Sequence, residues 1–200
     1  MEHQAAIFDL DGTLTKPYLD FDAMRREIGL PTESRTPILE AIECMDVAER
    51  ASAQAILDRH EQQAARASEL QESVIEVLDA IRAQGFRLGL STRNSRACTE
   101  IVLRQHELRF DDVHTRDDGI PKPSAEPILT MCRKWSVQPR DVWTIGDYLF
   151  DIQAGRVAGT KTVLMIGDGP CPDYADQADH VIRHLRELLL IMGITTWRTV

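Results

Sequence analysis

The chain has 200 residues, 43% of them hydrophobic, which is enough to bury the core of one main domain and a modest insertion. Its formal net charge of −9 disfavours a nucleic-acid or acidic-membrane partner, because like charges repel. No run approaches the roughly 18 apolar residues of a membrane-spanning helix, and a strand expected from about residue 5 leaves no room for a signal peptide, so we expect a cytoplasmic protein.

The first predicted element is a buried strand that ends in two carboxylates. Residues Ala5 to Phe8 are apolar without alternation, as in a parallel strand covered on both faces. Asp9 stands where this run stops, and Asp11 follows just before Gly12. The alternative is a pair of ordinary loop acids before a glycine turn. However, two crowded carboxylates repel unless a cation or proton lies between them, which favours a bound divalent metal.

A helical segment follows, with no strand signal for about seventy residues. We expect helices over residues 21–28, 37–45 and 48–67. The segment interrupts the chain directly after the first strand. We therefore predict a helical insertion at residues 16–68 and a main domain made of residues 1–15 and 69–200.

The remainder of the chain alternates helices with short apolar strands. Further strands are expected at 86–91, 112–115, 141–145, 162–166 and 180–182, with helices at 71–84, 95–106, from about 124, and at 185–192. This alternation is typical of the α/β class with a doubly wound parallel sheet.

Polar side chains recur where these strands end. Thr92 follows the second strand directly after Ser91, and Asp147 follows the fourth, with Asp151 four residues later. Lys122 lies between prolines in the loop after the third strand, which holds it in a fixed turn. Because the carboxyl ends of parallel strands lie at one edge of a sheet, we expect these groups to share one site with Asp9.

Four stretches in this order, AAIFDLDGTLT, LGLSTRN, GIPKPSAEP and TIGDYLFD, resemble the four motifs of the haloacid dehalogenase superfamily of phosphotransferases. The helical insertion resembles the small α-helical cap of that superfamily. Phosphoglycolate phosphatase is the nearest named type. Dehalogenases of this fold lack an acid at the position of Asp11, so the resemblance favours phosphate-ester chemistry.

The resemblance implies a role for each motif carboxylate. Asp9 would be the nucleophile that forms an aspartyl-phosphate. Mg²⁺ held by Asp9, Asp147 and the backbone carbonyl of Asp11 would offset the repulsion between this nucleophile and a phosphate dianion. Asp11 would act as general acid and base. Asp151 would orient the metal shell or Lys122, unless it only caps the helix that follows.

The remaining motif residues would bind the phosphoryl group. Lys122 would hold the nucleophile and the phosphoryl oxygens as a point charge, and the Thr92 hydroxyl would donate a hydrogen bond. Ser91 is the alternative hydroxyl, and Arg93 and Asn94 are candidate phosphate contacts.

The sequence therefore predicts a Mg²⁺-dependent phosphatase that acts on a small phosphorylated metabolite. A sugar phosphomutase resembling β-phosphoglucomutase would use the same groups but pass the phosphoryl group to a sugar. A signalling receiver is disfavoured, because its phosphorylated Asp follows the third strand. A catalytically silent binding protein is disfavoured by the intact motifs. The sequence leaves the substrate and the oligomeric state open.

Overall fold

The computed structural model describes residues 4–34 and 36–195 and divides into two compact units. The first unit contains Met1–Pro17 and Glu69–Val200, and the second contains Tyr18–Ser68. The insertion was expected to begin at residue 16, but Lys16 belongs to the first unit. Its N–H donates to the Glu69 carbonyl at 2.9 Å, and its ammonium lies 2.8 Å from the Glu69 carboxylate.

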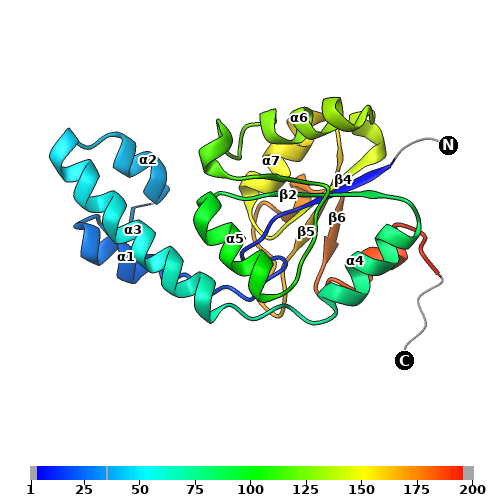
Figure 1. Ribbon diagram of the computed structural model, residues 1–200, viewed down its shortest axis with the longest axis horizontal. Helices are drawn as coiled ribbons and strands as arrows, with labels where there is room; N and C mark the ends of the chain where they lie inside the picture. The colour runs from blue at the N-terminus through cyan, green and yellow to red at the C-terminus, as the bar shows by residue number, and fades with distance from the viewer. Residues whose placement is uncertain (1–3, 35, 196–200) are drawn as a thin grey trace. The chain divides into compact units, whose positions relative to one another are not determined.

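The described residues of the first unit form a six-stranded parallel sheet (Figure 1). The strand order is β3-β2-β1-β4-β5-β6, and Phe8 of β1 pairs with Leu90 of β2 and Ile145 of β4. The strands are β1 (Ala5–Phe8), β2 (Arg87–Ser91), β3 (Asp112–His114), β4 (Val142–Gly146), β5 (Lys161–Met165) and β6 (His180–Ile182). The predicted α/β class and parallel sheet are confirmed.

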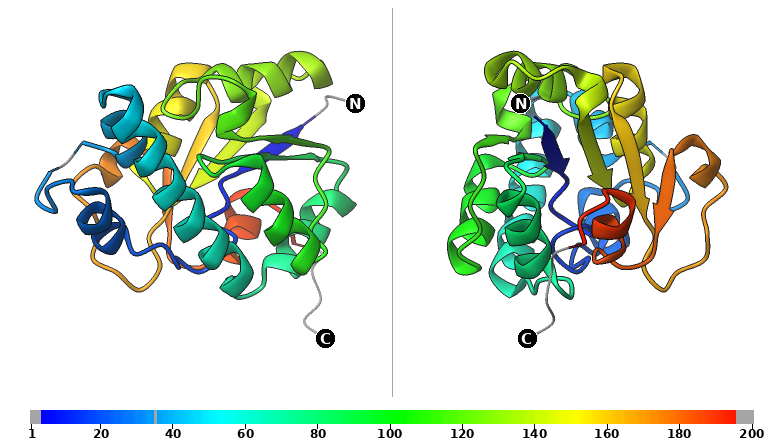
Figure 2. Two further views of the ribbon diagram at one scale, coloured as in Figure 1. Left: turned by 60° about the vertical axis from the view of Figure 1, so that its left-hand side comes forward. Right: turned by 90° about the vertical axis from the view of Figure 1, so that its right-hand side faces the viewer.

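Helices cover both faces of this sheet, as Figures 1 and 2 show. Helices α6 and α7 lie on one face, where Ile7 of β1 packs in one core cluster with Ile128 and Met131 of α6. Helices α4 and α5 lie on the other face, and α4 contacts α8. The helices are α4 (Val74–Ala83), α5 (Arg96–Gln105), α6 (Glu126–Trp135), α7 (Leu149–Ala158) and α8 (Glu187–Ile191), with short 3-10 helices η1 (Arg116–Asp118), η2 (Pro139–Asp141) and η3 (Ala175–Gln177).

The strand order reverses between β1 and β4. The chain runs outward from β1 through β2 to β3, and then returns to the other side of β1 as β4. In sheets of this kind, ligands bind outside the carboxyl ends of the strands at the point where the order reverses. Asp9 and Asp147 directly follow these two strands.

The described residues of the second unit form three helices, α1 (Phe21–Ile28), α2 (Ile38–Glu43) and α3 (Val47–Ala67). Asp20 caps α1 by accepting the N–H of Ala23 at 2.9 Å, and Gly29 ends the helix in the left-handed conformation. The unit has its own small core, made of Met24, Ile38, Ile42, Ala53 and Leu57. None of the helices in the described ranges is both long and apolar enough to cross a membrane.

Candidate active site

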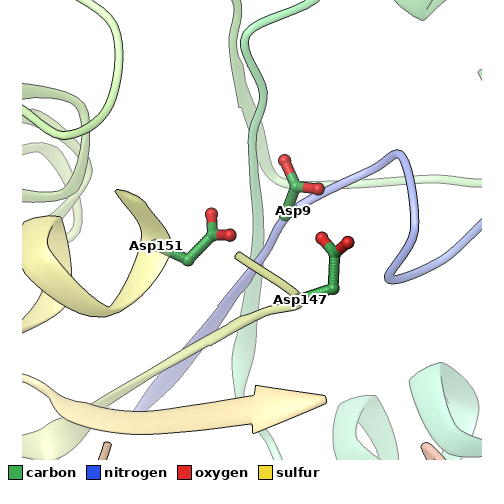
Figure 3. Close-up of side chains that lie close together, drawn as sticks. All are labelled: Asp9, Asp147 and Asp151. Carbon is green, nitrogen blue, oxygen red and sulfur yellow. The ribbon is translucent and has the colours of Figure 1, made fainter. Parts of the chain in front are cut away.

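Three carboxylates from two neighbouring strand ends and one helix converge where the strand order reverses. Asp9 leaves β1 with its N–H donating to the Ile145 carbonyl of β4 at 2.8 Å. Asp147 directly follows β4, and Asp151 lies in the first turn of α7. One carboxylate oxygen from each of these aspartates lies within 4.8 Å of the others. Figure 3 shows the three side chains grouped at this edge of the sheet.

Lys122 joins two of these carboxylates. Its Nζ atom lies 2.5 Å from Oδ1 of Asp9 and 2.5 Å from Oδ1 of Asp151, and the residue is only 3% exposed. The second oxygen of Asp151 accepts the backbone N–H of Tyr148 at 3.1 Å, so Asp151 also caps α7. Asp151 therefore has two roles in the structure: one oxygen binds the Lys122 ammonium, and the other caps the start of α7.

Burial and mutual repulsion set the charges of this group. Burial raises the pKa of Asp9 to about 7; the charges of Asp151 and Asp11 act in the same direction, and Lys122 opposes them. Burial, with the charges of Asp9 and Asp151, also raises the pKa of Asp147 well above its ordinary value. Burial would lower the pKa of Lys122, but Asp151 and Asp9 outweigh it, so the pKa is raised and the ammonium stays charged.

The donor set fits a divalent cation. When ionised, three carboxylates face the single ammonium of Lys122, which leaves two unit negative charges uncompensated within this group. The ligands are all carboxylate oxygens, which Mg²⁺ prefers over nitrogen and sulfur. Among the described residues, this group contains Asp151 and does not contain the Asp11 side chain.

Asp11 lies in a tight turn beside the group. It is half-buried, and its Oδ1 accepts the Thr15 hydroxyl at 3.4 Å. The N–H of Gly12 donates to the Thr15 carbonyl at 2.9 Å, which closes the turn. The charge of Asp11 acts on both Asp9 and Asp147, as expected for a neighbour of the site.

Gly12 makes room for Asp147. Its φ of +86° lies in the left-handed region, and a Cβ built at this position would lie 2.2 Å from Oδ2 of Asp147. The Thr13 hydroxyl donates to Oδ1 of the same carboxylate at 3.3 Å. The turn after Asp9 therefore shapes the space in which Asp147 sits.

We expect Gly12→Ala to lower catalytic activity by about tenfold or more, because the new methyl group displaces Asp147. The strained φ should also destabilise the fold by about 1–2 kcal/mol. Gly85→Ala is the matched control, since Gly85 has a φ of +83° with nothing within 4 Å of the built Cβ. Steady-state kinetics and thermal unfolding of both variants check this. Equal activity in both would show that Asp147 tolerates the methyl group.

The loop after β2 carries the predicted phosphate contacts. Ser91 and Thr92 are both buried, and the Thr92 N–H donates to the His114 carbonyl at 3.0 Å. The Thr92 Oγ1 accepts the N–H of Asn94 at 3.1 Å. A hydroxyl that accepts one hydrogen bond can still donate its own hydrogen, so this geometry is compatible with phosphate binding by Thr92.

Arg93 makes contacts that the sequence did not predict. Its guanidinium donates to the backbone carbonyl of Lys122 and lies over the ring of Phe150, 4.9 Å from the ring centroid. No sequence pattern predicts this arrangement, because Arg93, Lys122 and Phe150 lie far apart in the chain.

A family model described as haloacid dehalogenase-like hydrolase matches residues 6–165. The chain is 30% identical to N-acetylmuramic acid 6-phosphate phosphatase of Pseudomonas aeruginosa, over 96% of each chain. It is 41% identical to phosphoglycolate phosphatase of Nitrosospira multiformis over 90 residues, which cover 44% of this chain and 40% of that one. A hydrolase from Pseudomonas syringae superposes with a TM-score of 0.81 and 18% identity, covering 96% of this chain and 98% of the other.

Proposed function

The chain belongs to the haloacid dehalogenase-like hydrolases and is a phosphatase of that family, and on this premise we propose that it hydrolyses a small phosphorylated metabolite through an aspartyl-phosphate on Asp9. The observation that carries the proposal is the contact of one buried ammonium, Lys122, with both Asp9 and Asp151, beside Asp147. This arrangement supports a nucleophilic carboxylate held in place by a fixed positive charge.

Mg²⁺ is the proposed cofactor. Asp9, Asp147 and the backbone carbonyl of Asp11 would hold it, and when bound it would neutralise charge that otherwise repels a phosphate dianion. Asp151 would keep Lys122 in place, since it already binds the ammonium through one oxygen.

Asp9 and Asp11 would carry out the bond and proton transfers of the reaction. An Asp9 oxygen forms a bond to phosphorus while the bond from phosphorus to the ester oxygen breaks, and Asp11 donates a proton to that leaving oxygen. Asp11 then takes a proton from water as the water oxygen bonds to phosphorus and the bond to Asp9 breaks. Lys122 and the Thr92 hydroxyl would stabilise the phosphoryl oxygens throughout, with Asn94 as a further candidate contact.

The helical unit Tyr18–Ser68 is proposed to be the cap that the family resemblance implies. It would select the substrate among small phosphate esters. The two relatives are named for substrates as different as N-acetylmuramic acid 6-phosphate and phosphoglycolate. Because these named substrates differ, the substrate of this chain has to be identified by experiment.

The test is phosphate release from a panel of phosphorylated metabolites, with Mg²⁺ and with a chelator. The panel should include phosphoglycolate, N-acetylmuramic acid 6-phosphate and several hexose phosphates. We expect release that requires the metal and differs strongly between substrates. Transfer of the phosphoryl group to an added sugar would instead support a phosphomutase. No release and no transfer by a folded protein would contradict the proposal.

The raised pKa of Asp9 predicts how the metal-free protein responds to pH. A carboxyl whose pKa rises from 3.8 to about 7 on folding contributes stability that is present below the unfolded value and is lost as the pH rises through about 7. Asp147 shifts in the same direction, whereas Asp118, with a pKa of about 2, titrates below this window.

With a chelator present, we therefore expect a lower melting temperature at about pH 8 than at about pH 5.5. Mg²⁺ should restore the melting temperature at the higher pH, because it binds the ionised carboxylates of the folded state. Asp9→Asn should flatten this pH dependence. A melting temperature that rises from the lower to the higher pH without metal, or that ignores Mg²⁺, would argue against the site.

A further inference from the structure

Arg93 contacts Lys122 and the residue that directly precedes Asp151. Its guanidinium donates to the carbonyl of Lys122 itself, and it lies over the ring of Phe150, the residue directly before Asp151. From this geometry we propose that Arg93 is a positioning residue that fixes Lys122 against Asp9 and Asp151, and that it does not serve as a phosphate ligand. The inference rests on the proposed phosphatase reaction.

The backbone of the Arg93 loop is itself anchored. The Arg116 guanidinium donates to the Arg93 carbonyl at 3.2 Å, and the Arg116 N–H donates to the Asn94 carbonyl at 3.3 Å. The Asn94 N–H in turn donates to Thr92 Oγ1. The backbone of Arg93 is therefore held in place by these hydrogen bonds. Its side chain can then fix the position of the loop that contains Lys122.

The chemistry of the contacts explains why arginine stands here. A guanidinium is planar, so its face can stack on an aromatic ring while an N–H in its plane donates to a carbonyl. A lysine ammonium is a point charge on a flexible stem and cannot fix both partners in one geometry. Arg93→Lys should therefore restore only part of the activity that Arg93→Ala loses.

The position of Lys122 matters because its Nζ serves two carboxylates at 2.5 Å each. Without the donor from Arg93, the carbonyl of Lys122 and its loop lose one constraint on their position. A displacement of a catalytic group by about 1 Å can lower the rate about 10²-fold. The binding of phosphate itself should change little, because Arg93 is not part of that contact.

The first experiment separates positioning from phosphate binding. Arg93→Ala and Phe150→Leu are each expected to lower kcat by roughly tenfold or more, while KM and the inhibition constant of inorganic phosphate stay within about twofold. Phe150→Tyr keeps the aromatic face and should retain the wild-type kcat. The losses of Arg93→Ala and Phe150→Leu should not add in the double variant, since Arg93→Ala already removes the contact that Phe150→Leu breaks. Arg104→Ala, an exposed arginine paired with Glu100, is the control.

The second experiment tests the positioning role of Arg93 without measuring catalysis. Crystal structures of the wild type and Arg93→Ala should show Nζ of Lys122 between Asp9 and Asp151 in the wild type and displaced in the variant. Thermal shift with inorganic phosphate should be equal in both proteins. An undisplaced Lys122, or a phosphate shift that disappears in Arg93→Ala, would overturn the positioning role. If the wild type released no phosphate from any ester, the phosphatase proposal would fail, while these two measurements would still decide the role of Arg93.

Discussion

Asp9→Asn is expected to lower metal-dependent phosphate release by about 10⁴-fold or more, because the amide cannot serve as the nucleophile. The substitution preserves the shape of the side chain. It also removes a buried carboxyl whose pKa is raised to about 7. At about pH 8 without metal, the variant should therefore be at least as stable as the wild type, which separates lost chemistry from lost folding.

Kinetics and thermal unfolding of Asp9→Asn, side by side with Asp79→Asn, measure this prediction. Asp79 is exposed on α4 and pairs with Arg82, so the same chemical change there should leave the activity intact. Activity in Asp9→Asn within tenfold of the wild type would rule out Asp9 as the nucleophile.

Lys122→Met should impair both activity and stability. The variant removes the ammonium that binds Asp9 and Asp151, so we expect a loss of activity of about 10³-fold. Removal of one partner from a buried ion pair typically costs about 3 kcal/mol, because the remaining charges are left uncompensated. Since the pKa of Asp9 would rise further without this ammonium, the loss of stability should grow as the pH increases.

Lowered pH or added Mg²⁺ should recover part of the stability of Lys122→Met, because protons or metal then neutralise the same carboxylates. Lys134→Met is the control, since Lys134 is exposed and pairs with Asp112 at 2.9 Å. A melting temperature equal to that of the control at every pH would contradict the proposed electrostatic role of Lys122.

The strand ends were predictable from the sequence for a physical reason. A buried parallel strand reads as an uninterrupted apolar run, so the residue at which the run stops is visible without a structure. Asp9 and Asp147 stand at such positions, and the structure brings both together where the strand order reverses. The prolines around Lys122 likewise indicated a fixed turn, but not which carboxylates its ammonium would meet.

The contacts between loops depend on the strand order, which the sequence does not state. Arg93 reaches Lys122 and Phe150 only because β2 and β4 flank β1 in the sheet. The sequence pattern also does not determine the residue at which the insertion begins. Lys16 joins the first unit through its bonds to Glu69, a residue that lies on the other side of the whole insertion.

The exact ends of helices also depend on tertiary contacts that the sequence pattern does not reveal. The helix expected from residue 71 begins at Val74, because Gln71 instead continues the contact with the first loop: its N–H donates to the Leu14 carbonyl at 2.9 Å and its side chain to the Gly12 carbonyl at 3.2 Å. Helical periodicity identified the buried face of α4 correctly, with Val74, Val77, Leu78 and Ile81 all buried. These contacts hold Gln71 outside the helix.

The most direct test of the aspartyl-phosphate mechanism is to trap the covalent intermediate on Asp9. The protein would be mixed with Mg²⁺ and the best substrate of the panel, quenched in acid within one turnover, and digested for mass spectrometry. We predict that the peptide containing Asp9 gains the mass of one phosphoryl group, and that Asp9→Asn does not. Phosphate release without any phosphorylated peptide, or with the phosphoryl group on another residue, would contradict the aspartyl-phosphate mechanism.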